Sequence, residues 1–168
     1  MLRDKILTRD ELAKALEGQR DKTIVSTNGC YDLMHPGHLY TFMKAKNMGD
    51  ILVVGVNTDE YIRKFKNPFR PILQEGARAM MVASCMYVDY VVLFGEENPI
   101  ELLKVIKPNI HLKSKTGYKG LEKDVVESNG GQIVLVDDLQ EYSTTNLIHR
   151  CVKSYIQEER GNTEWINK

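Results

Sequence analysis

Short, almost purely apolar segments recur along the chain, and their alternation with helical segments restricts the fold more than any other feature. The clearest is residues 51–56, Ile-Leu-Val-Val-Gly-Val, a run that no polar residue interrupts. A strand that is apolar at every position is covered on both faces, as the strands of parallel sheets are. The strands expected on this basis are 23–27, 51–56, 90–94, 109–113 and 133–136.

The segments between these strands carry the spacing of apolar residues that is typical of helices. The expected helices are 8–16, 37–48, 75–87, 99–106, 121–128 and 144–156. The first begins with a capping box, because Thr8 is followed three residues later by Glu11. Strands that alternate with helices predict an α/β fold in which a parallel five-stranded sheet has helices on both faces.

The length and composition indicate one globular domain. The 168 residues are 42% apolar and 27% charged, which excludes a disordered chain, a collagen-like chain and a coiled coil. No linker rich in glycine, serine or proline divides the sequence. We therefore expect a single domain over residues 1–168, with an N-terminal helical extension at 1–20 and a polar C-terminal tail at 157–168.

Charge and cysteine content narrow the range of partners. The 23 basic residues balance the 23 acidic ones, so no overall basic field attracts nucleic acid or anionic lipid. The chain has an odd number of cysteines, and they lie far apart in the sequence: Cys30, Cys85 and Cys151. This pattern argues against a disulfide framework or a structural zinc site. No apolar run approaches the roughly 20 residues that span a bilayer, and the charged N-terminus does not resemble a signal peptide. We expect a cytoplasmic protein without a nucleic-acid or membrane partner.

Two histidines follow the first expected strand, at the carboxyl edge of the sheet where ligands of α/β proteins bind. His35 and His38 enclose Pro36 and Gly37, at the start of a helix. Two imidazoles beside free helix N–H groups suit a phosphate, and Gly37 lets the chain approach the ligand closely. The alternatives are two surface histidines near a helix cap, or a zinc site. We expect no metal site, because no third ligand has suitable spacing nearby.

The segment from Gly29 to Asp32, followed by His35-Pro36-Gly37-His38, resembles the His-x-Gly-His signature of the cytidylyltransferase-like nucleotidyltransferases. Residues 27–32 are most similar to the heptose 1-phosphate adenylyltransferases, and the resemblance runs from about residue 7 to residue 150. It implies a Rossmann-like nucleotidyltransferase fold. It also implies an enzyme that joins a nucleotide to a phosphorylated acceptor, releases pyrophosphate and so makes ADP-heptose for bacterial surface glycans such as lipopolysaccharide.

Further segments match this family in register. Residues 46–59 resemble its second strand–helix segment, in which Lys46 matches a basic position that approaches phosphate. Arg70-Pro71 resembles an Arg-Pro loop, and Arg78 matches an arginine whose guanidinium would hold the nucleotide phosphates. Apart from the resemblance, Lys46 and Arg78 would be interpreted as solvated helix residues.

Ser143-Thr144-Thr145 resembles the family's Ser-Thr-Thr motif in front of the last helix. Hydroxyl residues at that position satisfy free N–H groups, and the remaining N–H groups can bind a phosphate. A plain helix cap is the alternative. One loop departs from the family: residues 113–119 read Lys-Ser-Lys-Thr-Gly-Tyr-Lys where the relatives have Lys-Gly-Gly-Asp-Tyr. The identities of the base and of the acceptor therefore stay open.

The resemblance implies a role for each matched residue. Those expected to act in catalysis are His35, His38, Lys46 and Arg78, and those expected to bind the nucleotide are Asn28, Gly29, Cys30, Tyr31, Gly37, Ser143, Thr144 and Thr145. Those expected to bind the acceptor are Asp32, Asn57, Asp59, Arg70 and Lys113. Asp32 would either orient a histidine or help to hold Mg²⁺, which accompanies the nucleoside triphosphate, through water.

Three functions agree with these residues. The first is transfer of AMP from ATP to a sugar 1-phosphate, a heptose 1-phosphate above all. The second keeps the chemistry with other ligands, as a cytidylyltransferase for glycerol phosphate or another polyol phosphate, or as an FMN adenylyltransferase. The third is a catalytically silent nucleotide-binding module. Expected partners are ATP or another nucleoside triphosphate, a sugar phosphate and, on resemblance alone, a second copy of the chain.

Overall fold

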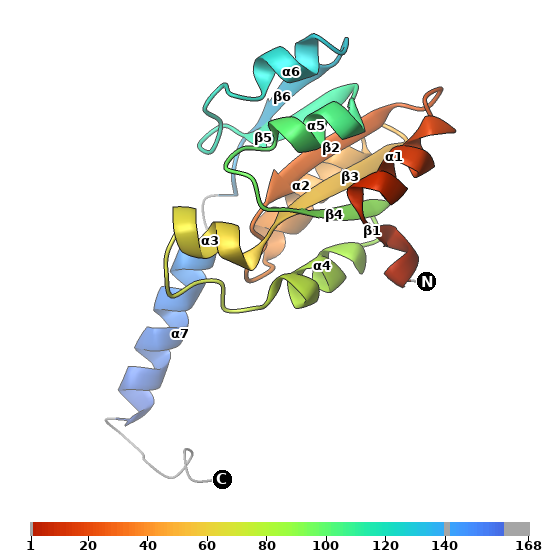
Figure 1. The fold of residues 1–168 in the computed structure, drawn as a ribbon. Helices are drawn as coiled ribbons and strands as arrows, with labels where there is room; N and C mark the ends of the chain where they lie inside the picture. Colours follow the sequence, from red (N-terminus) through yellow and green to blue (C-terminus); the bar gives the residue numbers. More distant parts are fainter. Residues whose placement is uncertain (1, 140–141, 160–168) are drawn as a thin grey trace.

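The computed structural model describes residues 2–139 and 142–159 (Figure 1). Its strands are β1 (Ile6–Leu7), β2 (Ile24–Gly29), β3 (Ile51–Asn57), β4 (Tyr90–Phe94), β5 (Ile110–Ser114) and β6 (Gln132–Val136). Its helices are the 3-10 helix η1 (Leu2–Lys5) and the α-helices α1 (Arg9–Glu17), α2 (Pro36–Lys46), α3 (Asp59–Phe65), α4 (Glu75–Ala83), α5 (Ile100–Ile106), α6 (Lys123–Glu127) and α7 (Thr144–Glu159).

The strands form one parallel sheet in the order β1-β4-β3-β2-β5-β6. Strand β2 lies in the middle of the sheet. Strands β3 and β4 follow in the sequence and lie on one side of β2, and β5 and β6 lie on its other side. The register places Val25 beside Ile110 and Ser26 beside His111. The order of the strands thus reverses between β2 and β5, and a crevice opens at the carboxyl ends of strands at such a point.

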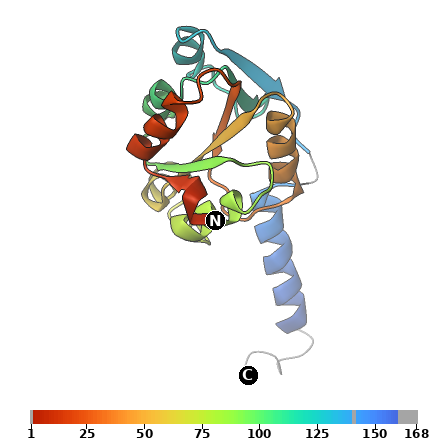
Figure 2. The same cartoon turned by 90° about the vertical axis from the view of Figure 1, so that its right-hand side faces the viewer.

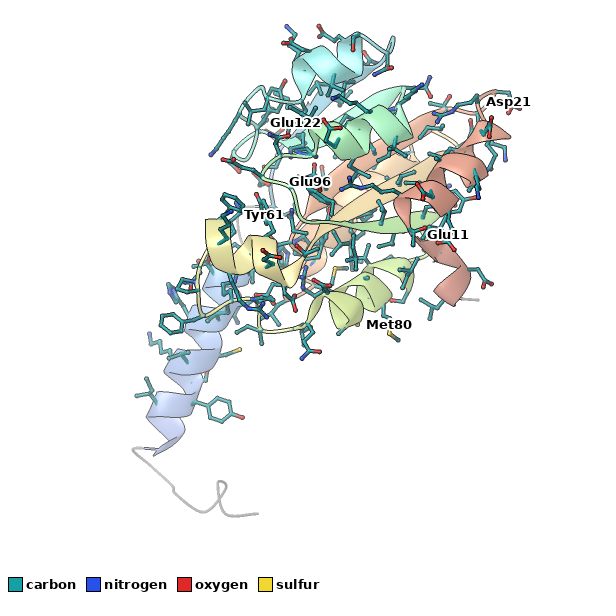
Figure 3. All side chains as sticks on the ribbon, in the orientation of Figure 1. Glu11, Asp21, Tyr61, Met80, Glu96 and Glu122 are labelled. Atoms are coloured by element: carbon teal, nitrogen blue, oxygen red, sulfur yellow. The ribbon has the colours of Figure 1, made fainter. Side chains whose placement is uncertain are left out.

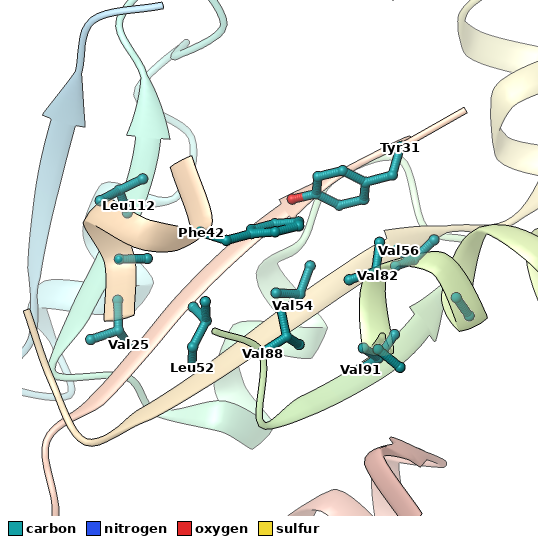
Figure 4. Close-up of a cluster of buried hydrophobic side chains, with 13 residues drawn as sticks. Val25, Tyr31, Phe42, Leu52, Val54, Val56, Val82, Val88, Val91 and Leu112 are labelled. Atoms are coloured by element: carbon teal, nitrogen blue, oxygen red, sulfur yellow. The ribbon is translucent and has the colours of Figure 1, made fainter. Parts of the chain in front are cut away.

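Alternate residues of each strand pack on opposite faces of the sheet, and helices cover both (Figure 2). On one face Leu52 and Val54 pack with Phe42 of α2 and Val82 of α4 (Figure 4). On the other face Val53 packs in a cluster with residues of α1 and α5. Complete burial of an aliphatic or aromatic side chain stabilises the fold by about 1.5–3 kcal/mol. The two layers therefore fix the plane of the sheet, and with it the positions of the residues at the strand ends.

The predicted α/β fold is confirmed, with six strands in place of five. The additional strand, β1, contains only Ile6 and Leu7, which pair with Val91 and Val92 at the edge of the sheet. Two residues are too few for a hydrophobic period to reveal, so the sequence does not predict them. Helix α3 is also absent from the prediction because it is short and polar, although Thr58 caps it by accepting a hydrogen bond from the Tyr61 N–H.

Several element boundaries differ from their expected positions. Strand β2 continues through Asn28 and Gly29, which were expected to end it, and α4 ends at Ala83, before the expected residue 87. The predicted capping box of Thr8 and Glu11 is confirmed. Helix α7 continues to Glu159, into the expected tail, and residues 160–168 of that tail lie outside the described residues. Within the described ranges, none of the helices has the length and apolar character needed to cross a bilayer.

Candidate active site

A cavity of about 540 Å³ lies at the carboxyl ends of β2 and β5, where the strand order reverses. Residues at the N-termini of α2 and α7 form part of its wall. The predicted site residues that line it are Asn28, Gly29, Cys30, Tyr31, His35, Gly37, His38, Asn57, Lys113, Ser143 and Thr144. The fold therefore brings together residues from the two ends of the chain, as the resemblance implies.

The imidazoles of His35 and His38 stack in this cavity with 3.7 Å between their ring centroids. In both rings Nδ1 is buried and has no hydrogen-bond partner among the described residues. Burial lowers the pKa of His35, and burial together with the neighbouring His35 lowers the pKa of His38 to about 3. Both rings are therefore neutral near pH 7. Because buried polar atoms are nearly always paired, the two unpaired nitrogens are an unusual feature of the residues that line this cavity.

The backbone before and after these histidines is shaped to hold them. His35 is the N-cap of α2 but makes no capping hydrogen bond with its side chain, which leaves the ring available to the cavity. A Cβ on Gly37 would come within 3.0 Å of the His35 ring, so glycine is needed for the rings to lie where they do. On the inner side, Tyr31 is buried and its ring contacts both His38 and Phe42 of the core. The histidine pair thus rests on the hydrophobic core.

The second helix end at the cavity is that of α7. Ser143 accepts a hydrogen bond from the Asn146 N–H at 3.1 Å, which is the geometry of an N-cap. Ser143 and Thr144 line the cavity, whereas Thr145 is exposed and does not. Helices α2 and α7 therefore direct their positive ends at the same space, and an anion placed there would interact favourably with both.

The structure does not place Lys46, which was predicted to act in catalysis, at the cavity. It lies at the last turn of α2, so the length of this helix separates it from His35 at the first turn. Its Nζ donates to a carboxylate oxygen of Asp89 and to the backbone oxygen of Asp50, both at 2.6 Å. These residues precede β4 and β3, at the amino edge of the sheet. Lys46 therefore has a structural contact at the edge opposite the cavity.

Arg78, predicted to hold phosphate, does not line the cavity either. The side chain is fully buried, and its three nitrogens donate to protein oxygens. These acceptors are the backbone oxygens of Leu73 and Cys30 and a carboxylate oxygen of Asp59, at 2.9, 2.5 and 2.7 Å. Arg78 therefore holds the turn after β2 in place through the Cys30 backbone oxygen. Its partner Asp59 does not line the cavity.

Asp32 and Arg70, both predicted to bind the acceptor, pair with each other outside the cavity wall. The Nε atom of Arg70 donates to a carboxylate oxygen of Asp32 at 2.9 Å. The other carboxylate oxygen accepts from the backbone N–H groups of Ile72 and Leu73. These protein groups occupy the buried carboxylate, whereas the prediction gave it a histidine or a hydrated Mg²⁺ ion as its partner. Asp32 fastens the loop before α4 to the turn after β2.

Among the lining residues that the sequence did not single out, two come from α3 and the segment that follows it. Tyr61 comes from α3 (Figure 3), and Lys66 follows that helix. Lys66 makes no ion pair with any other described residue, so its charge is available to an anion. A cation shortly after the carboxyl end of β3 could have indicated this position. The prediction missed it because α3 was not expected.

The loop after β5, which departs from the family's sequence, lines the cavity. Hydrogen bonds and an ion pair join it to the segment after β6. The hydroxyl groups of Ser114 and Thr116 both donate to a carboxylate oxygen of Asp138. Lys115 pairs with Asp137 at 2.7 Å and is turned away from the cavity. The extra positive charge of Lys115 is therefore compensated outside the site, while Ser114, Thr116 and Asp138 offer polar groups inside it.

The side chains at the cavity do not form a metal site of their own. No group of three or more histidine, cysteine, aspartate or glutamate side chains with the geometry to hold a metal ion occurs in residues 2–139 and 142–159. The acidic side chain in the wall, Asp138, already accepts two hydrogen bonds. Mg²⁺ commonly binds through substrate phosphates and water with few protein ligands. The donor set thus fits an ion that is carried by a triphosphate rather than one resident in the protein.

Comparison with known proteins agrees with this geometry. A family model described as cytidylyltransferase-like matches residues 26–152. The chain is 43% identical over 157 residues to the bifunctional protein HldE of Syntrophotalea carbinolica, and 42% identical over 152 residues to that of Helicobacter pylori. These matches cover 91% and 90% of this chain but only 32% of each relative. The chain therefore spans about a third of the length of these curated relatives.

Solved structures share the fold. A lipopolysaccharide core biosynthesis protein from Thermoplasma volcanium aligns with a TM-score of 0.62 and 25% identity, over 73% of this chain and 99% of that one. Pantoate-beta-alanine ligase from Francisella tularensis aligns with a TM-score of 0.56 and 13% identity, over 97% of this chain and 81% of that one. At that identity the second likeness concerns the fold alone.

Proposed function

Because the chain belongs to the cytidylyltransferase-like family, we propose that it is an adenylyltransferase that transfers AMP from ATP to a sugar 1-phosphate, a heptose 1-phosphate, and releases pyrophosphate. The product would be a nucleotide-activated sugar. The family match covers the whole cavity wall from β2 to the start of α7.

The observation that carries this proposal is the pair of stacked, neutral histidines with unpaired Nδ1 atoms between two helix N-termini. A neutral imidazole donates from one nitrogen and accepts at the other. Donors fixed in a partly dry site stabilise charge that grows on a phosphate in the transition state more strongly than water does. The two helix ends add favourable potential for the same anion without any side-chain charge.

The reaction needs positioning and charge compensation but no covalent intermediate. An oxygen of the acceptor phosphate attacks the α-phosphorus of ATP in line and forms the new P–O bond. The bond from the α-phosphorus to the bridging oxygen of the β-phosphate breaks, and pyrophosphate leaves with the electron pair. His35 and His38 would contact the α-phosphate, while Lys66 and the α7 N-terminus would hold the remaining phosphates. Bound Mg²⁺ would supply further compensation of the triphosphate charge.

A sugar phosphate is the acceptor best supported by the comparisons. The closely similar stretch of the HldE proteins covers nearly all of this chain, and residues 27–32 resemble the heptose 1-phosphate adenylyltransferases. The Thermoplasma volcanium relative is described as a lipopolysaccharide core biosynthesis protein. A product used to build a surface glycan is consistent with that description.

A matrix of substrates tests the proposal. Pyrophosphate release would be measured with Mg²⁺ for ATP, CTP and GTP, each combined with heptose 1-phosphate, glycerol 3-phosphate and FMN. Turnover is expected with ATP and heptose 1-phosphate, and a His35→Ala variant should lose it. Turnover with another pair would refute the substrate assignment but keep the chemistry. Nucleotide binding without turnover in any combination would support a binding module instead.

A further inference from the structure

The cavity contains a second basic residue, Lys113, whose surroundings differ from those of Lys66. Its Nζ lies 3.0 Å from a carboxylate oxygen of Glu122 and 3.1 Å from the amide oxygen of Asn28. The Lys113 and Glu122 side chains are only 13% and 7% exposed. Asn28 and Lys113 line the cavity, whereas Glu122, which is labelled in Figure 3, lies just before α6 and does not line it. The ammonium group is therefore held from two sides.

An ammonium group carries three N–H donors. Two of those on Lys113 have partners in Glu122 and Asn28. Within residues 2–139 and 142–159 the third has no partner, and it can serve the cavity that the side chain lines. Because Lys side chains are flexible, such a fixed direction requires partners that hold the group. Glu122 supplies the charged partner, and Asn28 fixes the ammonium beside the end of β2.

Glu122 also determines which ligand groups this donor suits. Its carboxylate neutralises the Lys113 charge, and its second oxygen is buried and has no hydrogen-bond partner in the described part of the chain. A phosphate drawn to Lys113 would therefore meet a nearby negative charge in a poorly solvated place, where repulsion is strong. An uncharged oxygen or nitrogen meets no such repulsion. Lys66 differs because no described residue forms an ion pair with it.

We propose that Glu122 is a positioning residue, which holds the Lys113 ammonium as a hydrogen-bond donor for an uncharged acceptor atom of a substrate rather than as a counter-ion for phosphate. The atom would belong either to the nucleoside, as a base nitrogen or a ribose hydroxyl, or to a hydroxyl of the sugar. This inference rests on the proposed function for the identity of the two substrates.

The test separates attraction for phosphate from recognition of uncharged groups. Inorganic tripolyphosphate and adenosine would each be titrated calorimetrically into the wild type and Glu122→Gln, and KM and kcat would be measured for ATP and heptose 1-phosphate. Glu122→Gln frees the Lys113 charge, so tripolyphosphate should bind severalfold more tightly. The KM of one substrate should rise about tenfold, the usual effect of losing a charged hydrogen bond, with a smaller change in kcat.

The substrate that responds identifies the contact. A rise in the KM of ATP, together with weaker binding of adenosine, places the acceptor atom on the nucleoside. A rise confined to heptose 1-phosphate places it on the sugar. The proposal is overturned if both KM values stay unchanged, or if tripolyphosphate binds more weakly to the variant than to the wild type.

Further variants separate positioning from a purely structural role. In a Lys113→Met background, Glu122→Gln should change neither KM further, because Glu122 acts through Lys113. Glu122→Asp keeps the charge but shortens the reach, so KM should rise without a gain in tripolyphosphate affinity. Glu101→Gln breaks the exposed pair with Lys104 on α5 and serves as the matched control. Equal effects of Glu122→Gln with and without Lys113 would overturn the proposal.

Failure of this inference is distinguishable from failure of the proposed function. If the wild type releases no pyrophosphate, the proposed function fails. The contrast between tripolyphosphate and adenosine in the binding titrations still tests the role of Glu122, because it requires no turnover. If turnover is normal and the contrast is absent, only the inference on Glu122 fails. Melting temperatures of all variants would show that each remains folded.

Discussion

His35 and His38 line the cavity with side chains that lack part of their hydrogen bonding to the described residues. Burial keeps both rings neutral, and their Nδ1 atoms have no hydrogen bonds to the residues that the structure describes. In an apo protein this arrangement costs free energy, because a buried unpaired polar atom is less stable than a solvated one. A bound phosphate would restore the missing hydrogen bonds only by turning the rings, because both nitrogens are buried. The same two residues thus account for both the unsatisfied atoms and the proposed catalysis.

Replacement of His38 by alanine should lower kcat by a factor of about 10²–10³, because one fixed donor to the transition state is lost. The fold should remain intact, because the unpaired Nδ1 of His38 contributes no hydrogen bond to it. Steady-state pyrophosphate release and thermal unfolding would be measured together. His149→Ala, on the exposed surface of α7, is the control histidine variant. Near-normal turnover of the His38 variant would contradict the role given to this residue.

Stability should fall in acid because of buried histidines. His111 hydrogen-bonds through Nδ1 to the Ser26 hydroxyl, and burial lowers its pKa to about 3. The unfolded chain binds this proton near pH 6.5, so between about pH 6.5 and 3 only the unfolded state is protonated at this site. The free energy of unfolding should therefore decrease as the pH falls through this window, by up to about 1.4 kcal/mol per pH unit for each such histidine.

Urea denaturation at several pH values from 7.5 to about 4 would measure this dependence. His111→Gln removes one titrating group and should reduce the slope, while the slope due to His38 remains. An equal slope in the variant and the wild type would show that His111 does not titrate as its burial requires.

At the scale of the elements, the segments after β2 and before α4 are held together by buried charged side chains. Arg78 of α4 ties the backbone oxygens of Cys30 and Leu73 to Asp59 at the start of α3. Asp32 ties Arg70 and the following backbone to the same region. The cavity wall therefore depends on charged residues that do not themselves touch the cavity.

Arg78→Met should destabilise the protein by about 3–5 kcal/mol, as the loss of one partner in a buried ion pair does. Its main effect should be on the free energy of unfolding, measured by urea denaturation. Activity would fall as a consequence, because the Cys30 backbone loses its support. If the variant instead kept its stability and lost only affinity for tripolyphosphate, Arg78 would be a phosphate contact after all.

At the scale of the whole molecule, the sequence predicts the layered α/β fold because apolar strands must be covered on both faces. The five longer strands occur within one or two residues of their predicted ends, since runs such as residues 51–56 have no other stable placement. The fold in turn brings His35 and Ser143 to one cavity. The approximate location of the site could therefore be predicted from motifs together with the order of the elements.

The roles of Lys46 and Arg78 could not be predicted in this way. Each looks like a solvated helix residue in the sequence. Whether such a side chain meets a ligand or a protein group depends on contacts between distant segments. Arg78 finds two of its acceptors, Cys30 and Asp59, in such segments, and Lys46 reaches Asp89 beyond α4. The role of Glu122 could not be predicted either, because its ion pair with Lys113 forms only when the loop after β5 folds.

The most direct test of the account follows the oxygen atoms of the acceptor. Heptose 1-phosphate labelled with oxygen-18 in its phosphate group would be incubated with ATP, Mg²⁺ and the protein, and the products examined by phosphorus NMR. In-line attack by the acceptor predicts that all of the label stays in the sugar nucleotide, with unlabelled pyrophosphate formed in equal amount. Oxygen-18 in the released pyrophosphate or in inorganic phosphate would contradict adenylyl transfer at this site. Formation of ADP without pyrophosphate would contradict it as well.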